Sequence, residues 1–296
     1  MKCFATFTMV IAIMVVGMAL TASAATSANN VLRLDADAIT GLSDGQTVAT
    51  WNDSSGKGNN ASGVNTPSYE TAEFNGGTMP GVYFDGSADY FNIAHSSSIN
   101  VTNNTVFVVT KTETTADRAY FLTKIETNGT SYCVEHAKQP NGYLSCGYNG
   151  GPGGIWAYRL TGGPHDNATG IATYWVDTST TVGTDAFNMY WNGSLDNGGA
   201  ADSGGGSPRV FTNGEPMRVG VVSYDGGSTF QRYCKGFIGE LILFDTTLTT
   251  TEINDVNAYL GDKWGITVAG GGDAAAGEAL LGGGGAATPG TLIYGK

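Results

Sequence analysis

The residues best suited to bind a ligand lie in a glycine-rich segment between residues 149 and 167. They combine flat rings with guanidinium, carboxylate and amide groups, and they are Trp156, Tyr158, Arg159, His165, Asp166 and Asn167. An aromatic ring stacks on the apolar face of a sugar, while the polar groups bind its hydroxyls. We therefore predict a carbohydrate-binding segment in a loop outside the regular strands. A long connection whose Trp156 packs back onto the core is the alternative, and both remain open.

A second candidate is the acidic turn from Asp85 to Asp89, which offers two carboxylates within five residues. Calcium prefers oxygen ligands of this kind, and it is the one cofactor that the sequence suggests. Asp and Gly are also the ordinary residues of a hairpin turn. The segment lacks the longer acidic series of an EF-hand loop. A calcium site and a simple turn therefore remain as alternatives.

Glu240 and Asp245 come nearest to the paired carboxylates of a glycoside hydrolase. A retaining pair must lie only about 5 Å apart on one side of a cleft. Residues five apart in a regular strand face opposite sides, so this pair does not qualify. The sequence also lacks the serine-hydrolase, zinc-peptidase and P-loop motifs. We predict that the chain is not an enzyme and that Glu240 is structural.

The predicted secondary structure that carries these candidate residues is organised around a strand and a helix in residues 236–266. The run Phe237–Asp245 is apolar on both faces, which is typical of a strand inside a packed sandwich. Thr249 and Glu252 then form a capping-box pattern, and Gly265 is a suitable C-cap. The apolar residues between them recur at helical spacing and are Ile253, Val256, Leu260 and Trp264. A helix near Thr250–Trp264 is therefore predicted.

Short β-like runs separated by Gly, Asn, Asp and Ser clusters fill the chain from Val31 to Ile266. Many short strands with a single helix indicate an all-β sandwich that forms one domain. The run Phe187–Trp191 alternates cleanly and is followed by Asn192-Gly193, which predicts a type I′ hairpin turn. The Tyr-Trp pairs at 174–175 and 190–191 are predicted core residues, with a sugar-stacking face as the alternative.

The two ends of the chain have different compositions from this central part. Residues 1–24 contain Lys2, a long apolar run and Ala22-Ser-Ala24, the pattern of a secretory signal peptide. Residues 25–30 form a short lead, and residues 267–296 are a Gly/Ala-rich segment predicted to be a flexible tail. No later segment is long and apolar enough to enter a membrane after cleavage. We predict a secreted protein, extracellular or at the cell surface.

Export permits disulfides, and three cysteines remain beyond the signal. Cys133 and Cys146 lie in adjacent strand-like runs, so a bridge between them is predicted. Cys234 is then odd, either buried and inert or available for an intermolecular bond. The formal net charge of −12 argues against nucleic acid and anionic membranes as partners.

Three further blocks carry a family resemblance together with residues 236–266. They are Leu34-Asp-Ala36, the block from Trp51 to Ala61, and the block from Gly81 to Tyr90. In order and spacing the chain resembles the laminin-G-like, concanavalin-A-like jelly-roll domains of secreted bacterial proteins. The resemblance implies a jelly-roll sandwich of two antiparallel sheets over residues 31–266 with one C-terminal amphipathic helix. It also implies one calcium ion on loops at the rim, where Asp85 and Asp89 are the best matching positions.

The fold alone does not determine function, because it hosts lectins, hydrolases, lyases and passive spacers. We predict a non-catalytic carbohydrate-binding or adhesive module that recognises an extracellular polysaccharide or glycoconjugate. One alternative is a structural surface or matrix protein that self-associates through the sandwich and tail. A glycoside hydrolase or polysaccharide lyase of the same fold is the second alternative.

Overall fold

The protein is described by a computed structural model. It describes residues 30–125, 133–149, 156–177, 186–199, 201–202, 214–223, 225 and 227–282. The predicted signal peptide and the last fourteen residues lie outside these ranges. Within them, none of the helices has the length and apolar character needed to cross a membrane.

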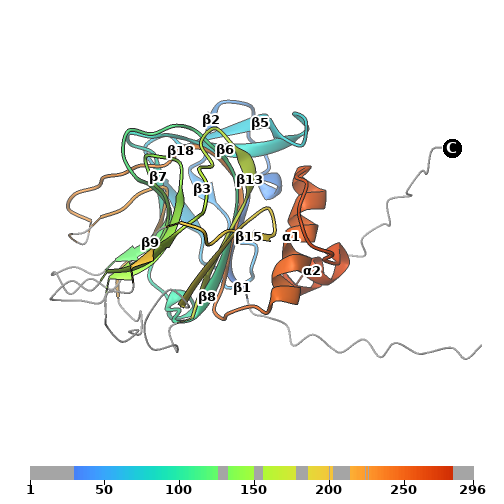
Figure 1. Ribbon diagram of the computed structural model, residues 1–296. Coiled ribbons are helices and arrows are strands. Elements are labelled where there is room, and N and C mark those ends of the chain that lie inside the picture. Colours follow the sequence, from blue (N-terminus) through green and yellow to red (C-terminus); the bar gives the residue numbers. More distant parts are fainter. Residues whose placement is uncertain are drawn as a thin grey trace, which may run out of the picture.

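Two antiparallel sheets pack face to face (Figure 1), which confirms the predicted all-β sandwich. Sheet A has the order β15 (Ser194–Leu195), β14 (Phe187–Trp191), β13 (Thr169–Val176), β8 (Asn104–Thr112), β18 (Lys235–Phe244), β6 (Met79–Asp85), β5 (Ser68–Phe74) and β2 (Gln46–Thr47), and β1 (Asn30–Asp35) also pairs with β18.

Sheet B has the order β16 (Ala201–Asp202), β12 (Trp156–Leu160), β11 (Leu144–Asn149), β10 (Cys133–Lys138), β9 (Ala119–Ile125), β17 (Met217–Val219), β7 (Tyr90–Ile93), β4 (Ala61–Val64) and β3 (Thr50–Trp51). Two short 3₁₀ turns complete the elements, at Ala36–Ala38 and Ser97–Ile99. The main core fills the space between the sheets, where it includes Phe84, Phe91, Leu122 and Met217, and it continues under α1. Each such side chain contributes about 1.5–3 kcal/mol by leaving water.

Strand β18 is buried on both faces, as its sequence predicts. One face lies against sheet B, and helix α1 (Thr250–Trp264) covers the other (Figure 1). The helix begins with the predicted capping box, in which Thr249 and Glu252 exchange hydrogen bonds, and it ends at Gly265 with φ 67°. Ile253, Val256, Leu260 and Trp264 are all buried. The position and the buried face of this helix are therefore confirmed.

A second helix, α2 (Ala274–Leu280), lies in the segment predicted to be a flexible tail. Asp273 caps it by accepting from the amides of Ala275 and Ala276. Small residues here serve helix packing, since a Cβ at Gly277 would lie 2.1 Å from the carbonyl oxygen of Asp255 in α1. Leu280 and Leu281 are buried as well. A flexible tail from residue 267 is therefore wrong for residues 274–281, because a Gly/Ala-rich composition also suits close helix contact.

The predicted Cys133–Cys146 bridge does not fit the pairing of β10 and β11. Cys146 pairs with His136, which lies three residues from Cys133. At about 3.4 Å per residue this offset is about 10 Å. A disulfide needs Cα atoms no more than about 7 Å apart. The bridge prediction is therefore wrong, because sequence adjacency of two strands does not reveal their register.

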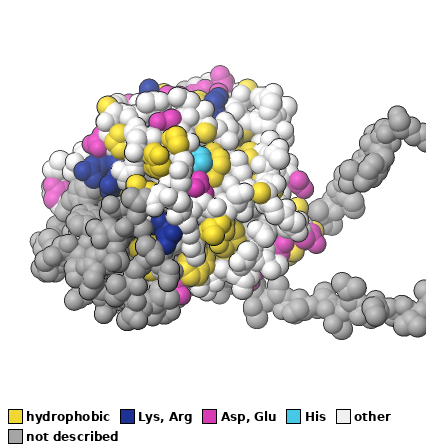
Figure 2. Space-filling model, in the orientation of Figure 1, with side chains coloured by type: hydrophobic (Ala, Val, Ile, Leu, Met, Phe, Trp, Pro, Cys, Tyr) yellow, Lys and Arg dark blue, Asp and Glu magenta, His cyan; other side chains and the backbone are white. Residues whose placement is uncertain are grey.

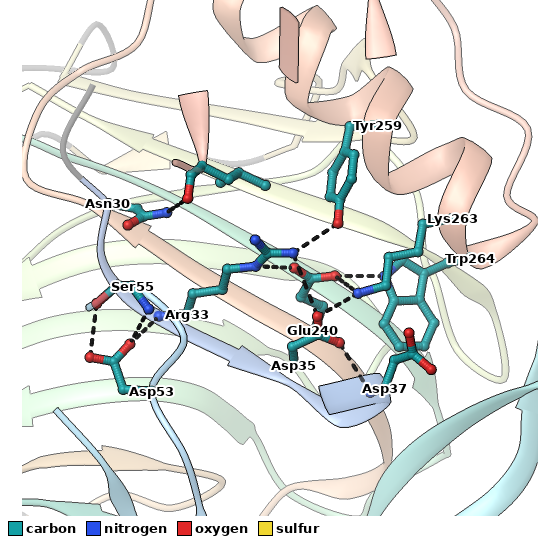
Figure 3. Close-up of polar contacts among 11 residues, drawn as sticks. Asn30, Arg33, Asp35, Asp37, Asp53, Ser55, Glu240, Tyr259, Lys263 and Trp264 are labelled. Atoms are coloured by element: carbon teal, nitrogen blue, oxygen red, sulfur yellow. Dashed lines mark hydrogen bonds and ion pairs between the residues drawn. The ribbon is translucent and has the colours of Figure 1, made fainter. Parts of the chain in front are cut away.

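The block from Trp51 to Ala61 is a loop held by one carboxylate. Asp53 accepts from the amide of Arg33 at 2.9 Å, from Ser55 through both amide and hydroxyl, and from the amide of Asn59 at 2.8 Å. Figure 3 shows Asp53 between Ser55 and Arg33. Asn59 in turn donates to the carbonyl of Val31 at 2.6 Å. This loop is therefore a structural tie between β1 and β4.

Candidate functional site

The structure separates the six predicted carbohydrate-binding residues. Trp156, Tyr158 and Arg159 belong to strand β12 and not to a loop, which corrects the predicted location. The side chains of Trp156 and Tyr158 lie outside the described part of the structure. Arg159 donates from Nη1 to the carbonyl of Asn197 at 3.3 Å, so it contacts the segment after β15.

The other three predicted residues lie in the loop between β12 and β13. Asp166 accepts from Lys138 at 2.5 Å, and the side chain of Lys138 is only 1% exposed, so this pair is structural. Asn167 takes φ 52° and donates to the hydroxyl of Thr114 at 3.0 Å, which marks a turn residue. His165 alone contacts residues that line an open pocket, Trp191 and Asp196.

His165 lies between a tryptophan and an acid from the hairpin β14–β15. Its ring stacks on Trp191 with a centroid separation of 4.2 Å, and its Nε2 lies 3.0 Å from Asp196 Oδ2. Oδ1 of Asp196 accepts from the amide of Gly162 at 2.5 Å. Asp196 therefore joins the hairpin to the loop that carries His165.

The hairpin borders a shallow pocket, which we call the rim pocket. Its lining residues come from the hairpin and from the segment after α1, and they are Trp191, Asn192, Ser194, Leu195, Asp196, Thr267, Val268 and Ala269. The predicted type I′ turn is confirmed by φ 50° at Asn192 and 78° at Gly193. A Cβ at Gly193 would lie 2.4 Å from the carbonyl oxygen of Ala269, so glycine permits the segment after α1 to dock here.

The chemistry of the rim pocket is that of a binding site. Trp191 is partly exposed, and Leu195 is 60% exposed, the most exposed large hydrophobic side chain in the described ranges. Asp196 is the one acid among the eight lining residues. It can accept hydrogen bonds from hydroxyls, whereas glycoside hydrolysis uses two carboxyl groups. The pocket therefore offers apolar surface and one acceptor.

Sequence reasoning found only part of this site. Tyr174 and Tyr190 are buried, as predicted, but they lie on opposite faces of sheet A, because Tyr174 pairs with Met189 and Tyr190 pairs with Thr173. Trp191 pairs with Ala172 and shares the face of Tyr174, while Trp175 shares the face of Tyr190, and both tryptophans are partly buried. The alternation of β14 was the available signal for Trp191. Leu195 and Asp196 had no comparable signal, because they reach the pocket through the fold of the hairpin.

The acidic turn at Asp85 is built by hydrogen bonds. Oδ1 of Asp85 accepts from the amides of Ser87, Ala88 and Asp89 at 2.8–3.1 Å, and Oδ2 accepts from the Ser87 hydroxyl. Burial opposes ionisation of Asp85, but these bonds outweigh it and lower its pKa to about 2. Asp89 accepts from the amide of Thr66 at 3.0 Å. Calcium binding at this turn stays a prediction.

The densest polar network lies under α1 (Figure 3) and is centred on Glu240. The Glu240 side chain is fully buried; Oε1 accepts from Arg33 Nε at 2.8 Å. Oε2 accepts from Lys263 Nζ at 3.0 Å and from the Trp264 indole at 2.9 Å. A polysaccharide cannot reach this carboxylate. Its position agrees with the structural role predicted for Glu240.

Two more residues complete this network. Arg33 donates from Nη2 to the Tyr259 hydroxyl at 2.8 Å, and Asp35 accepts from Lys263 at 2.5 Å. Burial alone lowers the pKa of Arg33 and of Lys263, but the neighbouring charges, above all that of Glu240, outweigh it and raise both pKa values. Each buried cation in the network therefore faces at least one carboxylate.

Figure 2 shows the Lys and Arg side chains of the described residues on one face of the molecule, where they occur in small separate groups.

Comparisons with known proteins identify the fold. No family model and no curated protein sequence matches the chain. Among solved structures it is similar to domain 4 of AbnA, a GH43 extracellular arabinanase from Geobacillus stearothermophilus, in complex with arabinotriose, at 16% identity over 77% of this chain and 98% of that one, with a TM-score of 0.53.

Two further solved structures are less similar. The Ruminococcus gnavus IT-sialidase CBM40 bound to α2,6-sialyllactose is 12% identical over 58% of this chain and 94% of that one, with a TM-score of 0.46. Trypanosoma rangeli sialidase is 14% identical over 80% of this chain and 33% of that one, with a TM-score of 0.48. The chain shares the β-sandwich fold of the arabinanase domain, which agrees with the predicted jelly-roll fold.

Proposed function

We propose that the chain is a secreted, non-catalytic module that binds an extracellular polysaccharide or glycoconjugate at the rim pocket. The observation that carries the proposal is the combination of Trp191, Leu195 and Asp196 around one opening. An aromatic edge and an exposed aliphatic side chain suit the apolar face of a sugar ring. The carboxylate beside them suits its hydroxyls.

Two further observations support this proposal. The arabinanase domain of similar fold is described in complex with arabinotriose, so this architecture accommodates saccharides. The signal-peptide pattern at residues 1–24 supports export to a compartment where polysaccharides occur. An intermolecular disulfide through Cys234 is the alternative for the cysteine left without a partner. It is disfavoured because Cys234 is 2% exposed and burial raises the pKa of its thiol to about 12.

The test is affinity electrophoresis against a panel of plant, bacterial and animal polysaccharides, followed by calorimetry with the best ligand. We expect Trp191→Ala to weaken binding about three- to tenfold, which corresponds to the loss of one aromatic contact. Trp175→Ala is the matched control, because Trp175 is also partly buried on sheet A but donates to the carbonyl of Leu248 at 3.0 Å, away from the rim pocket. Equal losses in both variants, or none in Trp191→Ala, would refute the rim pocket as the site.

A reducing-sugar assay on the same polysaccharides tests the non-catalytic part of the proposal. We expect no new reducing ends from any ligand that the protein binds. Release of reducing ends that is abolished by Asp196→Asn would instead assign the chain to the hydrolases of this fold. Release that survives this substitution would place catalysis elsewhere in the chain.

A further inference from the structure

The outer face of sheet B carries a buried arginine without a hydrogen-bonding partner. Met217 and Val219 of strand β17 point into the main core, so Arg218 between them points to the outer face. Arg218 is only 3% exposed, and its Nε and Nη1 are buried with no hydrogen-bond partner. Buried side-chain donors are nearly always paired, so an unpaired guanidinium requires an explanation.

Among the described side chains, no carboxylate hydrogen-bonds to Arg218. Its cross-strand neighbours are the uncharged Asn92 of β7 and Thr123 of β9. Phe230 covers the guanidinium, whose carbon lies 5.5 Å from the ring centroid. Tyr90 stacks on Phe230 with centroids 4.8 Å apart. The guanidinium therefore lies against one ring of an aromatic pair.

The nearest acids act on Arg218 only through their charge. Burial lowers the pKa of Arg218, and the charges of Glu215, Tyr90 and Asp225 oppose that shift without outweighing it. Asp225 is occupied by its own loop, since its Oδ1 accepts from the Ser223 hydroxyl and from the amides of Ser228 and Thr229. The positive charge is therefore not neutralised by a contacting acid within the described ranges.

Other arginines gather on the same face. Arg118 and Arg232 both donate to the hydroxyl of Tyr120, at 3.1 and 3.3 Å. Tyr120 belongs to a small cluster apart from the main core, with Ile125, Ala137 and Val222. Half of the arginines of an acidic chain thus lie on one side of the sandwich. Arginine is the side chain best suited to planar oxyanions.

We propose that the outer face of sheet B holds a second binding site, in which Arg218 receives the carboxylate of an acidic saccharide. The carboxylate assignment rests on Arg218 itself, and the saccharide assignment rests on the proposed function of the chain. Phe230, which is partly exposed and lies over the guanidinium, offers an apolar ring beside that carboxylate. This site is distinct from the rim pocket, which is built from sheet A and the segment after α1.

The test uses the full secreted chain and three probes at matched ionic strength: trigalacturonate, a neutral galactose trimer and succinate. We expect trigalacturonate to bind by calorimetry, and Arg218→Met to weaken it about ten- to hundredfold, as expected for the loss of a hydrogen bond between charged groups. The neutral trimer should not respond to Arg218→Met. Succinate should bind far more weakly than trigalacturonate. Equal binding of both acids would overturn the saccharide assignment.

Two controls separate this proposal from the others. Arg232→Met removes a cation of the same face whose guanidinium donates to the Tyr120 hydroxyl and lies 3.7 Å from the Asp117 carboxylate, and it should change trigalacturonate affinity much less. Equal losses of trigalacturonate affinity in Arg218→Met and Arg232→Met would show that the ligand responds to the overall positive potential of this face. That result would refute a local site at Arg218. Trp191→Ala should leave trigalacturonate binding intact, so failure of the rim pocket and failure of the Arg218 site are distinguishable. No binding of trigalacturonate to the wild type would overturn the proposal.

Discussion

The two outer faces of the sandwich each bury an arginine, and they treat it in opposite ways. On sheet A, under α1, the Arg33 side chain is 12% exposed and contacts Glu240, Asp35 and Tyr259. On sheet B, Arg218 is 3% exposed and has an aromatic ring over it, with no acid in contact. The charge of Arg33 is balanced by carboxylates of the chain itself. For Arg218 we propose that the carboxylate of a bound ligand balances the charge.

The comparison of Arg33 with Arg218 shows how a structural charge can be distinguished from a ligand-binding charge in this fold. A buried ion pair is a poor source of stability, but removing one member leaves the other uncompensated and is costly. Removal of a buried charge that has no contacting partner leaves no opposite charge uncompensated, so it should cost little stability. Stability measurements on each face can therefore test the comparison without knowledge of the ligand.

The largest effect is expected from Glu240→Gln, which removes the anion of the sheet A network. Arg33 and Lys263 then remain as buried cations, and we expect the free energy of unfolding in urea to fall by about 3–5 kcal/mol. Glu73→Gln is the matched control, because the Glu73–Lys111 pair has a similar distance of 2.9 Å but is partly exposed, at 22% for Glu73 and 42% for Lys111. The control should lose no more than about 1 kcal/mol. A loss of the same size in both variants would contradict the structural role of Glu240.

The next prediction compares the two arginines directly. Arg33→Met leaves Glu240 with one charged partner fewer, and it should lower the free energy of unfolding by about 3–5 kcal/mol. Arg218→Met removes a buried charge that has no hydrogen-bond partner, so it should change stability by less than about 1 kcal/mol or increase it. Chemical denaturation of both ligand-free variants measures this. A large loss in Arg218→Met would mean that the guanidinium is structural.

The pH dependence of stability should show the same contrast for two lysines. The raised pKa of Lys263 means that its contribution is complete below about pH 10.5 and is lost as pH rises through its folded-state pKa. Burial instead lowers the pKa of Lys124 to about 8. The unfolded chain then binds more protons between about pH 8 and 10.5, so Lys124 makes stability rise across this window.

Urea unfolding at pH 7.5, 9 and 10 measures this effect. Lys124→Met should abolish the rise between pH 8 and 10 that is due to this group, whereas Lys263→Met should not. Lys124 Nζ donates to the carbonyl of Glu215 at 2.7 Å, a contact that does not depend on the charge of another side chain. An identical pH profile in wild type and Lys124→Met would contradict the lowered pKa.

The smallest effect is expected for calcium at the acidic turn, where the Asp85 carboxylate can be compared with that of Glu240. The Asp85 carboxylate is already occupied by donors of its own turn, as Glu240 is by its cations. We therefore expect the same melting temperature with calcium and with EGTA. A bound ion at a hundredfold excess over Kd would add about 2.7 kcal/mol, or roughly 5–10 °C. A shift of that size, lost in Asp85→Asn with Asp89→Asn, would establish a calcium site.

Some features of the protein follow from the sequence because a few neighbouring residues determine them. The capping box at Thr249 and Glu252, the helical spacing up to Trp264 and the Asn192-Gly193 turn are local patterns, and the structure reproduces each one. Strand alternation likewise places Tyr190 and Trp191 on opposite faces of sheet A. The all-β fold is the sum of such local signals.

Other features depend on contacts between distant parts of the chain. Glu240 meets an arginine 207 residues away only because β1 pairs with β18. The register of β10 and β11 separates Cys133 from Cys146, and helix packing orders residues that composition assigned to a flexible tail. Arg218 looks like any other strand residue until the strands beside it are known. Whether a charge finds its partner is decided by strand order and register, since side chains interact over a few ångströms in space and not along the sequence.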